Sequence, residues 1–185
     1  TENKVLDVTR DVFLVGCYTA QRFSDYSRIN KSNIKELKTG TKVIELKQQK
    51  TGEKVVIPIK PELLTILEKH KFDLPKTHEQ KVNLHIKTVG ELAGIKEKIE
   101  IEEIKGGLIL KTKKFKYNLI KTHTARRTGA TLMYLAGIPS LDIMKITGHK
   151  TEREFLKYIK VTKEQTAQNL ALHPYFQSSP LKVVN

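Results

Sequence analysis

A helix is predicted to begin with residues 122–129, THTARRTG, in this 185-residue chain. The small and apolar residues that recur at helical spacing are Ala125, Gly129, Leu132 and Ala136. Thr122 is expected to cap the helix, which should end near Gly137. A spacing of three places His123 and Arg126 on one face of the first turn, where free backbone N–H groups favour an anion. This face could hold a phosphate, although an exposed basic turn is the simpler interpretation of these residues alone.

Upstream, apolar residues at helical spacing predict a buried helix over residues 5–20, followed by a break. A short second helix is expected from Asp25 to Ile29, with Ser24 as its N-cap. Arg22 therefore lies at a helix junction. Its planar guanidinium matches two phosphate oxygens, but a surface ion pair with Asp25 is the simpler interpretation of this arginine alone.

Two β-rich runs at residues 42–46 and 54–58 flank the turn sequence QQKTGE and predict a hairpin. Lys50 falls near its tip, where a lysine is either a solvated turn residue or a proton donor on a flexible side chain. A second small hairpin is expected across residues 98–110, followed by a basic run over residues 111–116.

The rest of the pattern is helical. Further helices are predicted over residues 61–70, 78–92, 140–147, 152–159 and 164–172. The chain is therefore expected to fold as a mainly α-helical domain with a small antiparallel sheet, an α+β fold. Residues 1–172 would form the domain and residues 173–185 a C-terminal tail.

Two features near the end of the domain have both a structural and a chemical interpretation. Gly148 and His149 follow the apolar helix 140–147, where a glycine typically ends a helix and a polar residue follows it. Tyr158 lies next to Ile159 and near Phe155, and an aromatic side chain at such spacing is usually part of the core. Taken separately, neither feature identifies a site.

Charge gives a first indication of a partner. The chain has 34 Lys and Arg against 20 Asp and Glu, a formal net charge of +14, spread over sequence that is expected to be folded. A polyanion is the expected partner, although a solubilising lysine surface would give the same balance. The single cysteine, Cys17, cannot form an internal disulfide and is expected to be buried in a reducing, intracellular setting. No apolar run reaches the length of a membrane span.

Read together, five separated motifs resemble the tyrosine recombinase (phage integrase) family in order and spacing. They are CYTAQRFSD at 17–25, QKTG at 49–52, THTARRT at 122–128, ITGH at 146–149 and Lys157-Tyr158, with Tyr158 nine positions after His149. The resemblance covers about residues 5–170. Two positions depart from the family pattern: Ala20-Gln21 stands where relatives commonly have Gly-Leu, and Gly129 where many have Phe.

The resemblance implies the DNA breaking-rejoining fold and a site-specific recombinase that joins DNA strands through a 3′-phosphotyrosine on Tyr158, without ATP, metal or cofactor. It implies that Arg22 and Arg126 hold the phosphate and that Lys50 protonates the leaving 5′-oxygen. It also implies that His123 is the base and that His149 is a further phosphate donor. The assignment between the two histidines stays open.

Family relatives act on double-stranded DNA, so the resemblance implies a homotetramer on DNA, a monomer otherwise, and a location in the bacterial cytoplasm. It also implies that a separate N-terminal DNA-clamping domain lies outside this chain. The tail at 173–185, which contains the sequence HPYF, is expected to dock either on a neighbouring subunit or on its own domain.

Three other classes of protein fit part of the sequence. A non-catalytic DNA-binding module would keep the charge, but the full set of six polar residues argues against it. A type IB topoisomerase would share the chemistry, but the short chain and the Gly-His motif favour a recombinase. A ribonuclease that uses the two histidines has no motif behind it.

Overall fold

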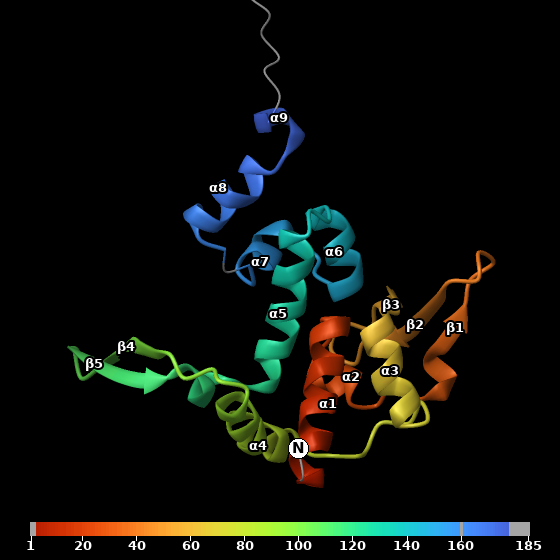
Figure 1. Cartoon of the computed structure of the whole chain (residues 1–185), viewed down its shortest axis with the longest axis horizontal. Coiled ribbons are helices and arrows are strands. Elements are labelled where there is room, and N and C mark those ends of the chain that lie inside the picture. The colour runs from red at the N-terminus through yellow and green to blue at the C-terminus, as the bar shows by residue number, and fades with distance from the viewer. Residues whose placement is uncertain (1–2, 160, 178–185) are drawn as a thin grey trace, which may run out of the picture.

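The computed structural model describes residues 3–159 and 161–177, and it has the predicted mainly α-helical fold with small antiparallel sheets (Figure 1). The N-terminal elements are α1 (Lys4–Thr19), α2 (Phe23–Tyr26), η1 (Lys31–Asn33), β1 (Ile34–Glu36), β2 (Lys42–Lys47), β3 (Lys54–Pro58), α3 (Pro61–Lys69) and α4 (Glu79–Leu92). The C-terminal elements are β4 (Lys98–Lys105), β5 (Leu108–Phe115), η2 (Lys116–Leu119), α5 (Thr122–Leu135), α6 (Ser140–Thr147), α7 (Glu152–Leu156), α8 (Lys163–Ala171) and α9 (Pro174–Gln177).

Helix α1 is central because it packs against α3, α4 and α5. Its apolar face, with Val12 and Val15 fully buried, joins a core to which the sheet and α3 also contribute. The sheet has the antiparallel order β1-β2-β3, with Ile44 opposite Ile57. Strand β3 alternates exposed and buried residues, as expected for a sheet with one covered face. Strand β2 buries Val43, Ile44 and Leu46 and is exposed at both ends. This packing fixes the position of the β2–β3 turn that carries Lys50.

The crossing of α1 and α5 depends on two glycines that lack side chains. A Cβ atom at Gly129 would lie 2.1 Å from the carbonyl oxygen of Cys17, and one at Gly16 would lie 2.6 Å from the Tyr26 ring. Any side chain at Gly129 would therefore push the helices apart. Gly129 is one of the two departures from the family pattern. It faces Cys17 near the end of α1, and Cys17 is the first residue of the first motif.

A second, smaller core holds the C-terminal helices. Ala130 of α5, Ile143 of α6 and Phe155 of α7 have no exposed surface and pack together. This cluster places the end of α6 and the segment after α7 over α5. The Gly-His motif and Tyr158 lie on those two segments, so the cluster determines where they meet the rest of the domain.

Several local predictions need correction. The second helix, predicted from Asp25 to Ile29 with Ser24 as its N-cap, instead runs from Phe23 to Tyr26 with Arg22 as its cap. Thr122 is the first residue of α5, and the cap is Lys121. Helix α7 ends at Leu156, so Tyr158 lies beyond it, and the basic run over residues 111–116 falls mostly within β5. Strand β1 was not predicted.

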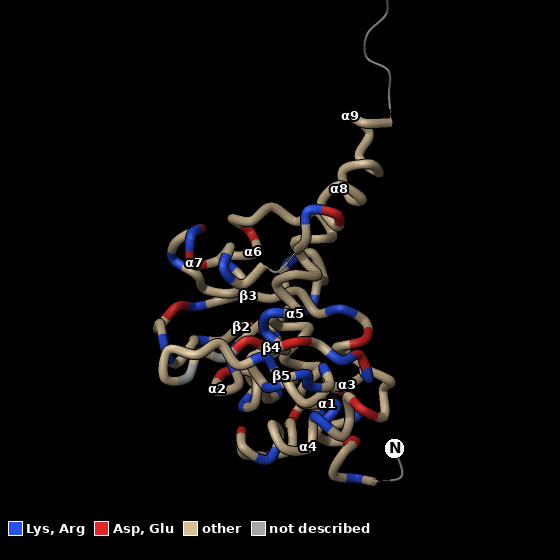
Figure 2. The backbone as a smooth tube through the Cα atoms, turned by 90° about the vertical axis from the view of Figure 1, so that its left-hand side faces the viewer, with Lys and Arg blue, Asp and Glu red and all other residues tan. Residues whose placement is uncertain are grey.

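Two segments project from the body of the domain: the hairpin β4–β5 in Figure 1, and the tail helices α8 and α9 in both Figures 1 and 2. No residue of α8 is buried. None of the described helices has the length and apolar character needed to cross a membrane.

Candidate active site

Arg126 lies at the centre of the site and has no exposed surface. Its Nη1 donates to the carbonyl of Ala20 at 3.0 Å and its Nη2 to the carbonyl of Thr147 at 2.7 Å. Ala20 ends α1 in the left-handed conformation, with φ 52°. These bonds hold the guanidinium between the end of α1 and the end of α6. Burial and the charge of Arg22 lower the pKa of Arg126 to about 10, while Tyr158 acts in the opposite direction.

Arg22, the cap residue of α2, is the second arginine of the site. Its side chain is half-buried, and Nη1 donates to Oε1 of Gln48 at 3.3 Å. The charge of Arg22 disfavours the charged form of Arg126 and of His149. Two guanidinium groups that repel each other in a partly buried place are stabilised by an anion that binds both.

His149 is held in one orientation by its neighbours. Gly148 ends α6 with φ 70°, which turns the chain sharply and directs His149 back toward α5. The Thr147 hydroxyl donates to the Ile143 carbonyl at 2.9 Å, so it accepts from Nδ1 of His149 at 2.8 Å. The remaining nitrogen, Nε2, then carries a lone pair and lies 3.4 Å from Nη2 of Arg126.

This environment favours the neutral form of His149. Burial, followed by the charges of Arg126 and Arg22, lowers the pKa of His149 to about 4. As a neutral ring with its proton on Nδ1, His149 accepts a hydrogen bond from Arg126. Donation from Nε2 to a phosphate would require the ring to take up a second proton, which binding of an anion would favour.

Tyr158 lies against both histidines and Arg126. Its ring centroid is 4.6 Å from that of His149 and 5.2 Å from that of His123, with both pairs in edge-on geometry. The guanidinium carbon of Arg126 is 5.6 Å from the centroid of the Tyr158 ring. Tyr158 is half-buried rather than part of the core, because α7 ends at Leu156 and the chain turns before it. The Tyr158 ring is therefore partly accessible beside Arg126 and both histidines.

His123 lies in the first turn of α5 beside Tyr158. Burial, followed by the charges of Arg126 and Arg127, lowers its pKa. A neutral imidazole next to a phenol can accept the phenolic proton. Helix α5 begins where it does because Thr122 is anchored by α4: its amide donates to Asn83 at 2.7 Å and its hydroxyl to Glu79 at 2.5 Å.

Lys50 is the predicted residue that does not join the cluster directly. It is exposed on the turn between β2 and β3, and its side chain makes no hydrogen bond or ion pair with any described residue. The turn itself is tied to the site, since Gln48 two residues earlier accepts from Arg22. This bond and one from the Gln49 amide to Asp25 hold the backbone of the Lys50 turn beside Arg22 and α2.

Four buried polar residues support the site and were not predicted from sequence. They are Gln21, Asp25, Gln48 and Thr147. Asp25 accepts from the amide of Gln49 at 2.8 Å and so holds the lysine turn against α2. Its place three residues after Arg22 was a usable signal, whereas Gln21, Gln48 and Thr147 acquire their partners only through the tertiary fold.

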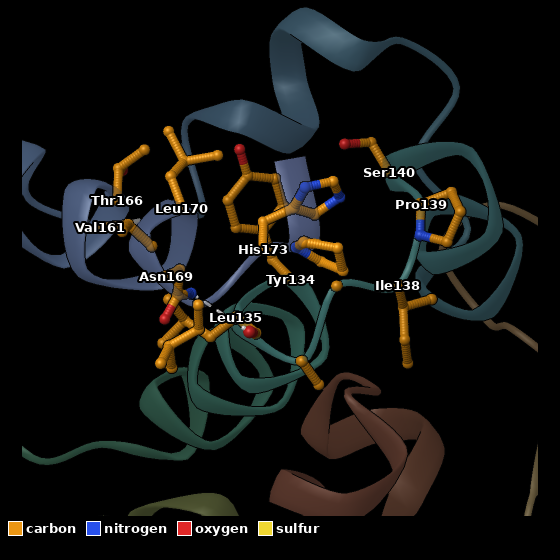
Figure 3. Close-up of a pocket in the computed structure, with 14 residues that line it drawn as sticks. Tyr134, Leu135, Ile138, Pro139, Ser140, Val161, Thr166, Asn169, Leu170 and His173 are labelled. Carbon is orange, nitrogen blue, oxygen red and sulfur yellow. Dashed lines mark hydrogen bonds between the residues drawn. The ribbon is translucent and has the colours of Figure 1, made fainter. Parts of the chain in front are cut away.

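A groove on the surface lies away from these residues. This groove of about 580 Å³ separates the corner between α5 and α6 from α8, and Tyr134, Ile138 and Leu170 are among the residues that line it (Figure 3). In the described part of the chain, no group of three or more His, Cys, Asp or Glu side chains could hold a metal ion.

The family model described as "Phage integrase family" matches residues 7–165. The chain belongs to the phage integrase family. Solved structures of family enzymes share its fold. XerH site-specific recombinase bound to a palindromic difH substrate is 13% identical with a TM-score of 0.64, covering 92% of this chain and 47% of that one. XerA recombinase is 14% identical with a TM-score of 0.61, covering 91% and 63%.

The catalytic domain of bacteriophage HP1 integrase differs from these in extent. It is 18% identical with a TM-score of 0.53, and the match covers 91% of this chain and 90% of that one. The chain thus spans about half the length of the XerH chain but most of an isolated integrase catalytic domain. No curated protein sequence matches it significantly.

Proposed function

We propose that this chain is the catalytic domain of a site-specific recombinase that cuts and rejoins double-stranded DNA through Tyr158. The observation that carries the proposal is the contact of a half-buried phenol with two histidines and the buried Arg126. A free phenol has a pKa near 10, so it needs a base or a cationic environment to attack at neutral pH. This cluster offers both.

In the proposed cleavage step, the Tyr158 oxygen attacks the phosphorus and its proton passes to His123. The 5′-oxygen leaves with a proton from Lys50, and the strand remains attached as a 3′-phosphotyrosine. Arg22 and Arg126 hold the non-bridging oxygens while negative charge builds up on them. Rejoining is the reverse: a 5′-hydroxyl attacks the phosphotyrosine, Lys50 regains a proton and His123 returns one to the phenol. One ester replaces another, so the cycle needs no ATP.

The geometry favours His123 over His149 as the base. Nε2 of His149 is occupied by Arg126 and its Nδ1 by Thr147, whereas no hydrogen bond to a described residue occupies the ring of His123. Its ring faces Tyr158 edge-on. His149 is then assigned to the phosphate, which it would contact as a protonated donor together with Arg126.

Double-stranded DNA is the proposed partner of the charged surface. Lysine and arginine are spread over the body of the domain, whereas α8 and α9 have only Lys163 and Glu164 as charged residues (Figure 2). Each phosphate contact should contribute a slope of about −0.9 to the dependence of log K on log salt concentration. Because this substrate is cellular DNA, we expect the protein to act in the cytoplasm of a bacterial cell.

The test uses a nicked duplex that carries the recombination junction of the mobile element encoding the protein. Cleavage next to the nick releases a short strand, which traps the covalent adduct for a denaturing gel. We expect an adduct from the wild type and from Tyr134→Phe, a partly exposed control tyrosine, and none from Tyr158→Phe. DNA binding is measured in parallel at low salt. A wild type that binds the duplex without forming an adduct, or equal adduct from Tyr158→Phe, contradicts the proposal.

We also propose that the tail of one copy packs on a second copy when the protein assembles as a tetramer on DNA. Leu172, Tyr175 and Phe176 are 74%, 68% and 59% exposed. The side chains of α8 make a single hydrogen bond to the described body of the domain, from Asn169 to the Leu135 carbonyl at 3.2 Å. Together with the open groove of Figure 3, this indicates a loosely packed interface. Burial of these side chains elsewhere would stabilise an assembly.

The tail is tested with Phe176→Glu, and with Gln168→Glu as a charge-matched control on the exposed surface of α8. If the tail docks on a neighbour, Phe176→Glu keeps adduct formation on a half-site but loses the four-subunit complex, as measured by light scattering, and loses strand exchange. If it packs on its own domain, the variant instead lowers the thermal stability of the monomer and leaves assembly unchanged.

A further inference from the structure

Two buried glutamines connect the separate segments of the candidate site. Gln21 has no exposed surface and Gln48 is 1% exposed. Nε2 of Gln48 donates to Oε1 of Gln21 at 2.6 Å and to the Thr147 carbonyl at 3.0 Å. Its Oε1 accepts from Arg22 at 3.3 Å and from the Thr51 hydroxyl at 2.7 Å. Both polar atoms of this side chain are therefore fully used.

Gln21 extends the connection to α6. Its Nε2 donates to the carbonyl of Thr19 at 3.0 Å and to that of Ile146 at 2.7 Å. The orientation of both amides is fixed by partners with one possible role: backbone carbonyls only accept, and a guanidinium only donates. The pair thus links the end of α1, the lysine turn and the last turn of α6 through a single set of bonds.

The backbone at Gly148 passes very close to Gln48. A Cβ atom at Gly148 would lie 2.3 Å from Oε1 of Gln48, so the Gly-His motif can pass this close only because it lacks a side chain there. Gln21 is also one of the positions that depart from the family pattern, where a leucine could form none of these bonds.

We propose that the Gln21–Gln48 amide pair is a positioning device that holds Arg22, the Lys50 turn and the Gly148-His149 segment in one fixed arrangement. The proposal rests on the recombinase function proposed above, since it assigns the pair a role in that reaction. The pair does not touch the reacting atoms. It acts through Arg22, which it binds directly, and through Thr147, whose carbonyl also accepts from Arg126.

The first test compares single-turnover formation of the covalent adduct by Gln21→Leu, Gln48→Leu and the double variant at saturating DNA. A displacement of about 1 Å in a site of this kind can cost roughly a hundredfold in rate, so each single variant should lose at least about tenfold with DNA affinity unchanged. Both substitutions break one shared device, so the double variant should be no more than about threefold slower than the slower single variant. Multiplying losses would overturn the proposal, as would single variants that cleave at the wild-type rate.

The matched control is Glu53→Gln. It removes an exposed ion pair with Lys150, at 3.6 Å, that spans the same gap between the lysine turn and the segment after Gly148. Exposed pairs contribute little, so this variant should cleave at the wild-type rate. Gln48→Asn keeps the amide on a shorter side chain and should recover part of the rate lost in Gln48→Leu without changing the melting temperature relative to it.

A second measurement does not depend on activity. Hydrogen exchange of the backbone amides at residues 48–53 should become faster in Gln21→Leu, although Gln21 makes no bond to the backbone of that turn. Unchanged exchange there would overturn the proposal. If the wild type forms no adduct, the recombinase function fails, and the exchange measurement still shows whether the pair couples the two segments.

Discussion

Arg126 is a charged side chain with no exposed surface, and the two backbone carbonyls that it binds come from the ends of different helices. Burying an ion is costly unless hydrogen bonds and a counter-charge compensate, and here the bonds are present while a bound phosphate would complete the compensation. The Nε atom of Arg126 has no partner among the described atoms. A residue in this position orients the other groups of the site as well as binding substrate.

Replacement of Arg126 with lysine should remove the planar, two-pronged recognition and keep the charge. We expect adduct formation to fall by about a hundredfold or more, as for loss of one donor to a developing oxyanion. Binding to duplex DNA should change by less than about threefold, because the net charge of +14 is retained. Single-turnover cleavage and fluorescence anisotropy measure the two effects. Equal losses in DNA binding and in cleavage would contradict the proposal that Arg126 holds the phosphate during cleavage.

His149 should make the fold sensitive to acid. Its pKa is about 4 in the folded state against an ordinary value of 6.5, so the unfolded chain binds more protons between these values. Its contribution to the free energy of unfolding is therefore complete above pH 6.5 and is lost as the pH falls toward 4. Urea unfolding measures this effect: between pH 7 and pH 5, the free energy of unfolding should fall less in His149→Asn than in the wild type. The pKa of His123 is also lowered, so the free energy of unfolding of the variant should still depend on pH to some extent.

Among the helices and strands, the sequence predicted those whose bounds are set by local residues such as turn glycines. The β2–β3 hairpin has two β-rich runs and a glycine turn, and α6 ends at a glycine, so both were predicted close to their observed bounds. Strand β1 was missed because Ile34-Lys35-Glu36 is too short to show alternation, and it is a strand only through pairing with β2. The six candidate residues came from motif order. Gln21 and Gln48 could not be predicted, because each meets its partners from distant segments.

The contact between α1 and α5 should fail if Gly129 acquires a side chain. Alanine favours helices over glycine by about 1 kcal/mol, yet its Cβ would overlap the Cys17 carbonyl. Overpacking of this kind costs about 1–3 kcal/mol, so Gly129→Ala should lower the free energy of unfolding on balance. Cleavage should fall as well, since the Ala20 carbonyl that binds Arg126 would shift. Leu132→Ala, an exposed position on the same helix, is the control, and an unfolding curve equal to wild type for Gly129→Ala would contradict this packing.

At the scale of the whole molecule, the domain combines a compact body that carries the site with two projecting segments, the β4–β5 hairpin and the α8–α9 tail (Figure 1). The expectation that the tail docks came from the family resemblance, and the apolar residues in its polar stretch were only consistent with it. The sequence left both docking on the same copy and docking on a neighbour open, because the apolar residues of a short segment do not specify the surface that covers them. Residues 178–185 of the predicted tail lie outside the described part of the chain.

The assembled molecule should bind DNA with a strong dependence on salt. A chain with a net charge of +14 that contacts several phosphates releases counterions on binding. Its affinity should therefore fall steeply between 50 mM and 200 mM salt, by on the order of a thousandfold for about six contacts. Isothermal binding titrations over this range measure the slope. A slope near zero would contradict DNA as the partner of this charge.

The proposal that Tyr158 forms the covalent link to DNA is tested by locating that bond. The trapped protein–DNA adduct is digested with nuclease and protease, and the peptide that carries a residual nucleotide is sequenced by mass spectrometry. We expect a nucleotide 3′-phosphate esterified to the oxygen of Tyr158 and to no other residue. A nucleotide on a different side chain, or a 5′-phosphate on Tyr158, would contradict it.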